Sequence, residues 1–214
     1  MYIKNRMTSD PYTLEKGASI TDAISLMHEK NLRRIPVVEN GKAVGIITKS
    51  DIQSVSPTKA TSLSIYEMNY ILTKTSVGDA MTKDPITIKP ESLLEEAAVL
   101  MRKNRISGLI VVDDDNNVVG IITESDIFDA FIDMFGMNEK GTRMSIIVDD
   151  RIGVLADVAA YFKNHNAALT NVVVFNNPGE KAELVFRTSS VDTEDIQNDL
   201  TAAGYKVASA IITK

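Results

Sequence analysis

The sequence contains no cysteine, and only two of its 214 residues are histidine. Without cysteine the chain has no disulfides, no thiol catalysis and no cysteine-ligated zinc or iron–sulfur site. The two histidines, His28 and His165, lie far apart in the sequence, so we expect no metal centre and assign neither residue a catalytic role. Much hydrolytic and redox chemistry therefore lacks its usual side chains.

Positive charge is also scarce. The chain has 23 lysines and arginines against 29 aspartates and glutamates, which gives a net charge of −6. Such a chain has no overall field that attracts DNA, RNA or an anionic membrane, so a phosphorylated ligand would need a local basic pocket. No apolar run approaches the ~18 residues that span a bilayer, and the first residues lack the apolar stretch of a signal peptide. We therefore expect a cytoplasmic protein with no nucleic-acid or membrane partner.

What the sequence does contain is an internal repeat. The pattern Met-Thr-x-Asp-Pro-x-Thr at residues 7–13 recurs at 81–87, and the run Val-Gly-Ile-Ile-Thr-x-Ser-Asp-Ile at 44–52 recurs at 119–127. Hydrophobic residues make up 44% of the chain and charged residues 24%, which is close to the globular average. The chain should therefore fold around a core, and the repeat decides its architecture before any single element does.

Each copy of the repeat predicts a short extended piece, an amphipathic helix, two apolar strands joined as a hairpin, and a second helix. Strands that are apolar at every position are expected to be buried on both faces. Ser92 with Glu95 predicts a capping box at the first helix of the second copy, and Ser19 with Asp22 predicts a weaker one in the first. The acidic run 113–115 is interpreted as a solvated hairpin tip rather than a cation site. The strands are expected at 35–38, 44–48, 109–112 and 118–123, a loop at 53–60, and a further helix from Ser64 to about Leu72 with Glu67 in its cap.

The order of these motifs resembles the CBS domain, which occurs as tandem pairs that pack with pseudo-twofold symmetry. The resemblance covers residues 1 to about 135. It implies a sensor with up to two clefts for AMP, ADP, ATP or a relative such as S-adenosylmethionine, which reports occupancy to another domain. We expect an α/β (α+β) fold in which residues 1–66 form the first repeat with its linker and residues 67–135 form the second.

The Thr-x-x-Asp motif at 48–51 and 123–126 has two interpretations. A hydroxyl and a carboxylate three residues apart at the start of a helix form a cap. The same groups also lie where a phosphate and the ribose hydroxyls could bind. The resemblance implies that Asp51 and Asp126 bind ribose and that Thr48 and Thr123 contact phosphate, with adenine held by backbone near the apolar strands. The implied nucleotide-binding set is Thr13, Arg33, Arg34, Ile35, Pro36, Val37, Thr48, Ser50, Asp51, Thr87, Leu109, Ile110, Val111, Thr123, Ser125 and Asp126.

The two expected clefts differ in charge. Arg33 and Arg34 precede the first apolar strand, whereas Ser107 and Gly108 occupy the matching positions in the second copy. Arginines at a helix end are most often a solvated edge. Because CBS proteins often carry phosphate-contacting basic residues at this place, the resemblance makes them candidate phosphate clamps.

The last third of the chain is a different unit. A polar, glycine-containing linker is expected at 136–141, and residues 142–214 predict the order βαββαβ of a ferredoxin-like fold. The turn at 150–155 resembles the D-x-P-G-V-L motif of ACT domains, which commonly bind amino acids where such domains meet in oligomers. Ile152 replaces the usual proline, but the glycine that lets a ligand approach the backbone is present. The candidate ligand residues are Asp150, Arg151, Gly153, Val154 and Leu155.

Together these features indicate a non-catalytic regulatory protein. It is similar to the stand-alone CBS–ACT proteins of the acetoin-utilisation type, which points to acetoin or central carbon metabolism. An adenine nucleotide would be its regulatory ligand, with no catalytic cofactor, and an amino acid or other small metabolite a further ligand. We expect a homodimer that acts through an unidentified protein partner or its own assembly. Two alternatives stay open: a structural dimerisation module with degenerate clefts, and a small transferase or hydrolase with Asp51 or Asp126 as base.

Overall fold

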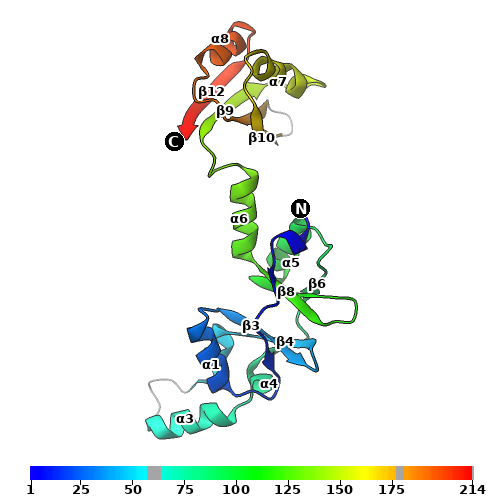
Figure 1. Ribbon diagram of the computed structural model, residues 1–214, viewed down its shortest axis with the longest axis vertical. Helices are drawn as coiled ribbons and strands as arrows, with labels where there is room; N and C mark the ends of the chain where they lie inside the picture. The colour runs from blue at the N-terminus through cyan, green and yellow to red at the C-terminus, as the bar shows by residue number, and fades with distance from the viewer. Residues whose placement is uncertain (57–63, 177–180, 214) are drawn as a thin grey trace. The chain divides into compact units, whose positions relative to one another are not determined.

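The computed structural model describes residues 1–56, 64–176 and 181–213 (Figure 1). The chain divides into two units, Met1–Phe128 and Asp129–Lys214, and each is described by itself. Residues 57–60 of the loop expected at 53–60 lie outside the described residues, as does part of the turn that separates the second and third strands of the second unit. Residues 53–55 were expected in the same loop, but they continue a helix that ends at Val55, which corrects that expectation.

The first unit contains fifteen elements in the described part of the chain, the last of which runs on into the second unit. They are η1 (Ile3–Asn5), β1 (Thr8–Ser9), β2 (Leu14–Glu15), α1 (Ile20–Glu29), β3 (Arg34–Glu39), β4 (Lys42–Thr48), α2 (Lys49–Val55), α3 (Ile65–Lys74), α4 (Val77–Ala80), β5 (Thr82–Lys83), β6 (Thr87–Ile88), α5 (Leu94–Asn104), β7 (Gly108–Val112), β8 (Val118–Thr123) and α6 (Glu124–Met134).

These strands form two sheets that exchange one strand each. The sheet of the first repeat has the order β2-β3-β4-β5, and the sheet of the second has the order β1-β8-β7-β6. The strand β1 comes from the first repeat but pairs with β8 of the second, and β5 comes from the second repeat but pairs with β4 of the first. Neither sheet is therefore complete within one repeat.

A glycine and a methionine pack against each other at each exchanged strand. Gly45 lies on β4, and a Cβ built on it would come 2.2 Å from the Sδ atom of Met81, which precedes β5. Gly120 on β8 has the same relation to Met7, whose Sδ atom would lie 2.5 Å from an added Cβ. The absence of a side chain at these two glycines is what lets the donated segments lie against the sheets.

The apolar strands are buried as their sequence predicts. Ile35 and Val37 on β3 have no exposed surface, and neither do Leu109, Ile110 and Val111 on β7. Burial on both faces follows from the helices and the second sheet that pack against them. These strands therefore contribute to the core of the unit.

The helix starts confirm most of the predicted caps. Ser19 and Asp22 form a complete capping box at α1, in which Asp22 Oδ2 accepts from the Ser19 backbone N–H at 3.0 Å. Ser64 and Glu67 form the same arrangement at α3. The box predicted from Ser92 and Glu95 is wrong by one residue: α5 starts at Leu94, and Glu96 accepts from the backbone N–H of Leu93 at 2.9 Å.

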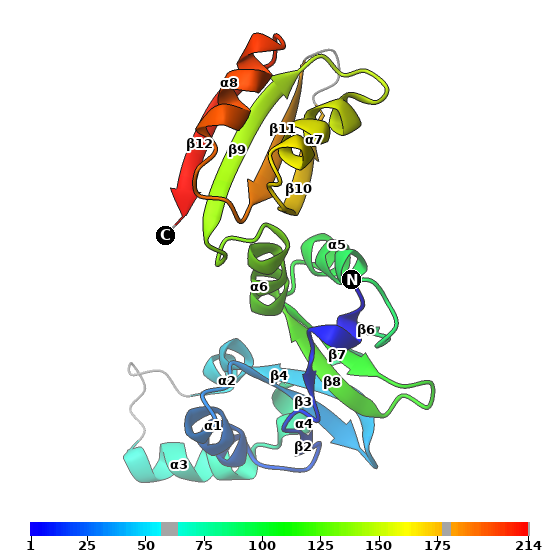
Figure 2. The same ribbon diagram turned by 45° about the horizontal axis from the view of Figure 1, so that its top comes forward.

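The second unit confirms the order βαββαβ. Its sheet has the antiparallel order β10-β11-β9-β12, and α7 and α8 lie together over one face (Figure 2). That face holds the core, in which the rings of Phe162 and Phe186 lie 4.9 Å apart between centroids. The elements are β9 (Gly141–Val148), α7 (Val154–Asn164), β10 (Leu169–Phe175), β11 (Ala182–Thr188), α8 (Glu194–Ala202) and β12 (Lys206–Thr213).

The packing of Gly45 against Met81 can be tested by mutation. We expect Gly45→Ala to lower the free energy of unfolding by about 1–3 kcal/mol, because the new methyl group overpacks the site where β5 joins β4. Met81→Ala removes the obstructing side chain, so the double variant should lose less than the sum of the two single variants. Urea denaturation of all three variants measures this coupling.

Gly17→Ala is the matched control, since nothing lies within 4 Å of a Cβ added there. It should cause no loss of stability. Strict additivity of Gly45→Ala and Met81→Ala would contradict the proposed contact.

Candidate functional site

Two hollows of similar construction lie in the first unit. The larger cleft has a volume of about 710 Å³ and the smaller cleft a volume of about 470 Å³. Both fall in the range of ~300–1,000 Å³ that is usual for small-molecule sites. The larger cleft is lined by residues 8–12, 31–34, Pro36, Ser107, Ile121 and 123–126. The smaller cleft is lined by Arg34, Ile46, Thr48, Thr82 and residues 84–86 and 104–108.

Each cleft combines segments of both repeats. The larger cleft joins the Asp-Pro segment and the start of β3 from the first repeat to the end of β8 and the start of α6 from the second. The smaller cleft joins the Asp-Pro segment and the end of α5 from the second repeat to the end of β4 from the first. The strand exchange causes this crossing. As a result Arg33 and Arg34 lie in one cleft with Thr123 and Asp126 of the other repeat.

The Thr-x-x-Asp motifs cap their helices. Asp51 Oδ2 accepts from the Thr48 backbone N–H at 2.8 Å and from the Thr48 hydroxyl at 2.7 Å. Asp126 Oδ2 makes the same two bonds to Thr123, both at 2.7 Å. Among the described residues, no hydrogen bond reaches the Oδ1 atom of either aspartate. Each carboxylate therefore serves the cap with one oxygen and keeps the other as an acceptor.

Arg34 lines both clefts, and so does its partner Ser107. The Arg34 Nη2 atom donates to the Ser107 hydroxyl at 2.8 Å. A Cβ built on Gly108 would lie 2.1 Å from Arg34 Nη1, so the guanidinium lies against the bare backbone of that glycine. Partial burial lowers the pKa of Arg34, while the nearby carboxylates of Glu124 and Asp126 act in the opposite direction. A single half-buried cation thus forms part of the wall of each cleft.

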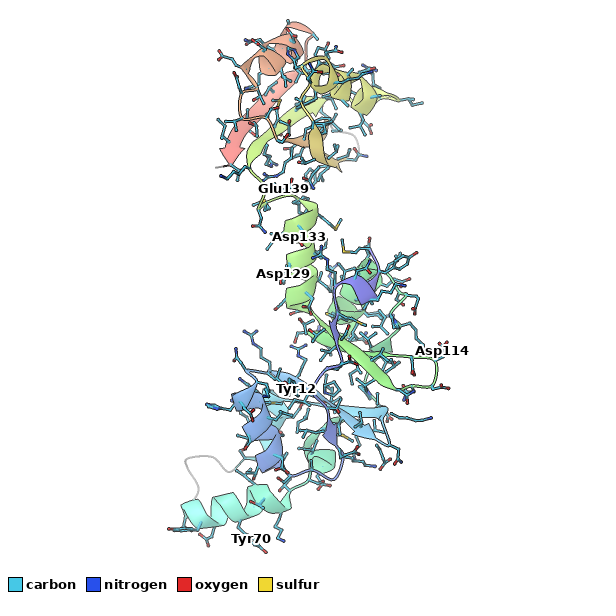
Figure 3. The ribbon with its side chains drawn as sticks, in the orientation of Figure 1. Tyr12, Tyr70, Asp114, Asp129, Asp133 and Glu139 are labelled. Carbon is cyan, nitrogen blue, oxygen red and sulfur yellow. The ribbon has the colours of Figure 1, made fainter. Side chains whose placement is uncertain are left out.

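The clefts also contain residues that the sequence analysis did not single out. Tyr12, which is labelled in Figure 3, lines the larger cleft and is 52% exposed. The equivalent residue of the smaller cleft is Ile86. Lys30 Nζ lies 5.4 Å from the centroid of the Tyr12 ring. Asp10 and Asp84 precede the prolines with positive φ angles of 47° and 49°. The variable position in Asp-Pro-x-Thr was the available signal for the Tyr12 and Ile86 pair.

The structure separates the nucleotide-binding residues expected from the sequence into three groups. Arg33, Arg34, Pro36, Thr123, Ser125 and Asp126 line the larger cleft, and Thr48 lines the smaller one. Ile35, Val37, Leu109, Ile110 and Val111 are buried within strands. Thr13, Ser50, Asp51 and Thr87 belong to the lining of neither cleft.

The turn before α7 is exposed except at Val154, which is buried. Gly153 is the N-cap of α7 with a φ of 87°, and nothing lies within 4 Å of a Cβ added to it. The positive φ angle, which glycine adopts without strain, therefore explains why a glycine stands at this position. Arg151 Nη2 lies 2.6 Å from Asp157 Oδ2, and this ion pair raises the pKa of Arg151.

Other polar groups have structural partners. Asp113 accepts from the backbone N–H groups of Asp115 and Asn117 and thereby shapes the β7–β8 hairpin, where Figure 3 shows Asp114 near the tip. His165 Nε2 lies 2.8 Å from Asp199 Oδ2.

No cluster of three or more His, Cys, Asp or Glu side chains suited to a metal occurs among the described residues. In the same part of the chain no helix is long and apolar enough to cross a membrane.

Comparison with known protein families identifies the family to which the first unit corresponds. Residues 3–57 and 77–133 each match the CBS domain. The two matches together cover more than half of the chain, which therefore belongs to the CBS-domain family and contains a tandem CBS pair.

Several solved structures are similar to this pair. A protein from Vibrio cholerae described as an acetoin utilization protein (AcuB) is 28% identical, with a TM-score of 0.53 over 64% of this chain and 95% of that one. CBSX2 of Arabidopsis thaliana, solved in complex with AMP, is 25% identical, with a TM-score of 0.52 over 62% of this chain and 96% of that one. The CBS domain pair of protein MJ0100, in complex with 5′-methylthioadenosine and S-adenosyl-L-methionine, is 32% identical, with a TM-score of 0.51 over 61% and 99%.

Curated relatives include larger enzymes. A homoserine O-acetyltransferase from Methanohalobium evestigatum is 32% identical over 127 residues, which is 59% of this chain and 23% of the enzyme. The chain thus matches less than a quarter of that enzyme's length.

Proposed function

We propose that the CBS pair binds adenosine ligands in its two clefts and that the chain is a non-catalytic regulatory protein. The observation that carries this proposal is the duplicated cleft, in each of which the threonine that starts a Thr-x-x-Asp helix in one repeat, Thr123 or Thr48, meets the Asp-Pro segment of the other. The similarity to pairs solved with AMP and with S-adenosyl-L-methionine supports the ligand class.

The larger cleft offers a partner for each part of such a ligand. The Oδ1 atom of Asp126 could accept from ribose hydroxyls, and the start of α6 favours a phosphate near Thr123. Arg33 and Arg34 supply positive charge, and guanidinium groups bind phosphate in a bidentate manner. The ring of Tyr12 and the face of Pro36 would contact the adenine base.

The remaining nucleotide-binding residues inferred from the family resemblance stay a prediction. The buried strand residues could take part only through their backbone groups. The Oδ2 atom of Asp51 accepts both hydrogen bonds of the cap at Thr48, so a ligand in the smaller cleft would have to bind Asp51 through its Oδ1 atom.

The first test is AMP titration of Asp126→Ala by calorimetry. Loss of a charge-assisted hydrogen bond costs about 1.5–3 kcal/mol, so we expect the larger cleft to bind AMP roughly ten- to a hundredfold more weakly. Asp51→Ala should weaken AMP binding at the smaller cleft.

Chromatography of the nucleotide after incubation with the protein should recover AMP, ADP or ATP unchanged, whereas turnover would favour the enzyme alternative.

Asp22→Ala is the matched control, because Asp22 caps α1 with the same bonds but neither Asp22 nor its cap partner Ser19 lines a cleft, whereas Thr48, the cap partner of Asp51, lines the smaller one. It should leave AMP affinity unchanged. Equal affinity in Asp22→Ala, Asp51→Ala and Asp126→Ala would contradict the ribose assignment, and failure of the whole protein to bind any adenosine ligand would favour a purely structural module.

The second test concerns the shared arginine. We expect Arg34→Ala to weaken AMP binding at both clefts and to weaken adenosine binding much less, because only AMP presents a phosphate to the guanidinium. Calorimetry with both ligands measures the difference. Arg102→Ala removes an exposed arginine outside both clefts and should affect neither ligand. Equal losses for AMP and adenosine would show that Arg34 does not meet the phosphate.

We further propose that the second unit is an ACT-like domain that contributes to a homodimer and holds a small ligand at the turn 150–155. The order βαββαβ and the partly exposed Val172, Val174 and Ile211 on its sheet support a role in assembly.

Light scattering on the full chain should give twice the monomer mass. Calorimetry with a panel of amino acids should find one whose binding is weakened by Leu155→Asp. A monomeric mass would contradict the dimer, and a silent panel would contradict the amino-acid ligand.

The biological setting rests on similarity alone. The likeness to the Vibrio cholerae protein supports a regulatory role in acetoin or central carbon metabolism, exerted through a protein partner or through assembly. Domain bounds at 66, 135 and 141 and the cytoplasmic location stay predictions from the sequence.

A further inference from the structure

The second unit contains a cavity that the proposed function does not use. It has a volume of about 150 Å³ and lies on the face of the sheet opposite to α7 and α8. The strands contribute Arg143, Asn171, Val185 and Arg187, and the segment before β9 contributes Phe135 and Met137. All of these residues belong to the second unit, so the cavity is built within it.

Two arginines line this cavity, and the described residues place no carboxylate beside them. Arg143 on β9 and Arg187 on β11 are directly opposite in the antiparallel ladder, so their side chains start from neighbouring points on one face. Like charges in directly opposite positions destabilise a sheet. Arg187 is only 7% exposed, yet no carboxylate of the described residues lies within 4.0 Å of either guanidinium.

The hydrogen bonds of Arg187 do not compensate for its burial. A guanidinium has five N–H donors. Those of Arg187 reach Thr213 Oγ1 at 3.4 Å, which is long for an oxygen acceptor, and the weak acceptor Met137 Sδ at 3.5 Å, and both acceptors are neutral. A buried charge without an opposite charge is costly, so the buried Arg187, with the half-buried Arg143 opposite it, points to an anion.

A buried acceptor accompanies the arginines. Asn171 Nδ2 donates to the Met134 carbonyl at 2.7 Å, which fixes the orientation of the amide. Its Oδ1 atom is then buried with no hydrogen-bond donor from the described residues. Gly136, with a φ of 59°, closes over the site: a Cβ added there would lie 2.3 Å from Asn171 Oδ1 and 3.1 Å from Arg187 Cδ.

We infer that this cavity binds a small hydroxycarboxylate. The carboxylate would pair with Arg143 and Arg187, and its hydroxyl would donate to the unpartnered Asn171 Oδ1 atom. The apolar side chains that complete the lining suit a short carbon skeleton. At about 30 Å³ per water molecule the cavity equals about five waters in volume, and because covalently bonded atoms lie closer together than water molecules do, a ligand of about six heavy atoms fits. An amino acid is disfavoured, because its ammonium group would lie beside two guanidinium cations.

Three probes of nearly equal size separate these contributions. L-Lactate carries the carboxylate and the hydroxyl, propionate lacks the donor, and L-alanine replaces the hydroxyl by an ammonium group. Calorimetry on the full chain, at ionic strength held constant with sodium chloride, should show saturable binding of lactate. Propionate should bind several-fold more weakly, and alanine at least tenfold more weakly.

Variants connect the binding to the cavity. Arg187→Met keeps the length of the side chain but removes the charge, and should weaken lactate at least tenfold. Asn171→Ala should bring lactate and propionate to equal affinity. Lys163→Met removes an exposed cation on α7, on the other side of the sheet, and should change nothing. Circular dichroism checks folding, and if Arg187→Met fails to fold, the lactate-to-propionate ratio in the wild-type protein and in Asn171→Ala still decides the question.

Absence of saturable lactate binding would overturn the inference, as would alanine binding equal to lactate or inorganic phosphate binding more tightly than lactate. The AMP titration of the same preparations is independent of these outcomes. Lactate binding without AMP binding would contradict the proposed nucleotide function alone, and AMP binding without lactate binding would contradict this inference alone.

Discussion

The exchange of strands β1 and β5 between the two repeats is the constraint on which the clefts depend. Each exchanged strand contributes only two residues to its ladder, too few to hold a segment in place by hydrogen bonding alone. Additional contacts fasten the first segment to the second repeat. Ile3 is fully buried and its N–H donates to the Ser92 carbonyl at 3.0 Å, while Leu94 donates to the Met1 carbonyl at 2.8 Å. The donated segments continue into the Asp-Pro stretches that line the clefts. By holding these segments, the strand pairing and the additional hydrogen bonds place cleft-lining residues of one repeat beside the helix start of the other.

A contact between the two repeats explains why the pair departs from exact twofold symmetry. Positions 34 and 108 are equivalent in the two repeats and lie in contact, since a Cβ on Gly108 would overlap the Arg34 guanidinium. Two arginines at these positions would bring like charges together in one crowded place. An arginine opposite a glycine resolves the conflict, and it leaves one cation serving two clefts. The difference in charge that the sequence shows between the repeats is therefore a packing requirement as well as a feature of the clefts.

The sequence predicts local structure well where a short-range pattern encodes it. The strand β8 has the bounds that its apolar run predicts, and the Ser19 and Ser64 caps form as their spacing requires. Before α5, Ser92 and Leu93 are neighbouring N-cap positions, and each is followed three residues later by a glutamate, Glu95 or Glu96. In the structure Leu93 is the N-cap, and its backbone N–H donates to Glu96 rather than to Glu95. Which sheet a two-residue strand joins is a different question. The two Met-Thr segments are nearly identical, and nothing in their own residues distinguishes pairing within a repeat from pairing across repeats.

The second unit shows a related limit. Alternation along β9 and β11 predicts which residues face the helices, because Met144, Ile146, Leu184 and Phe186 form the core. Polar residues on the opposite face are then assumed to be solvated, as Arg143 and Arg187 would be on a bare sheet. The segment with Phe135 and Met137 covers that face and turns Arg187 from a surface residue into a buried one. Replacing buried ionic groups by apolar residues of similar volume is often neutral or stabilising, so packing alone does not account for an unpaired buried arginine. Sites where such a local rule is broken are expected to be functional, and the opposed arginines beside an unpartnered amide oxygen break it twice in one cavity.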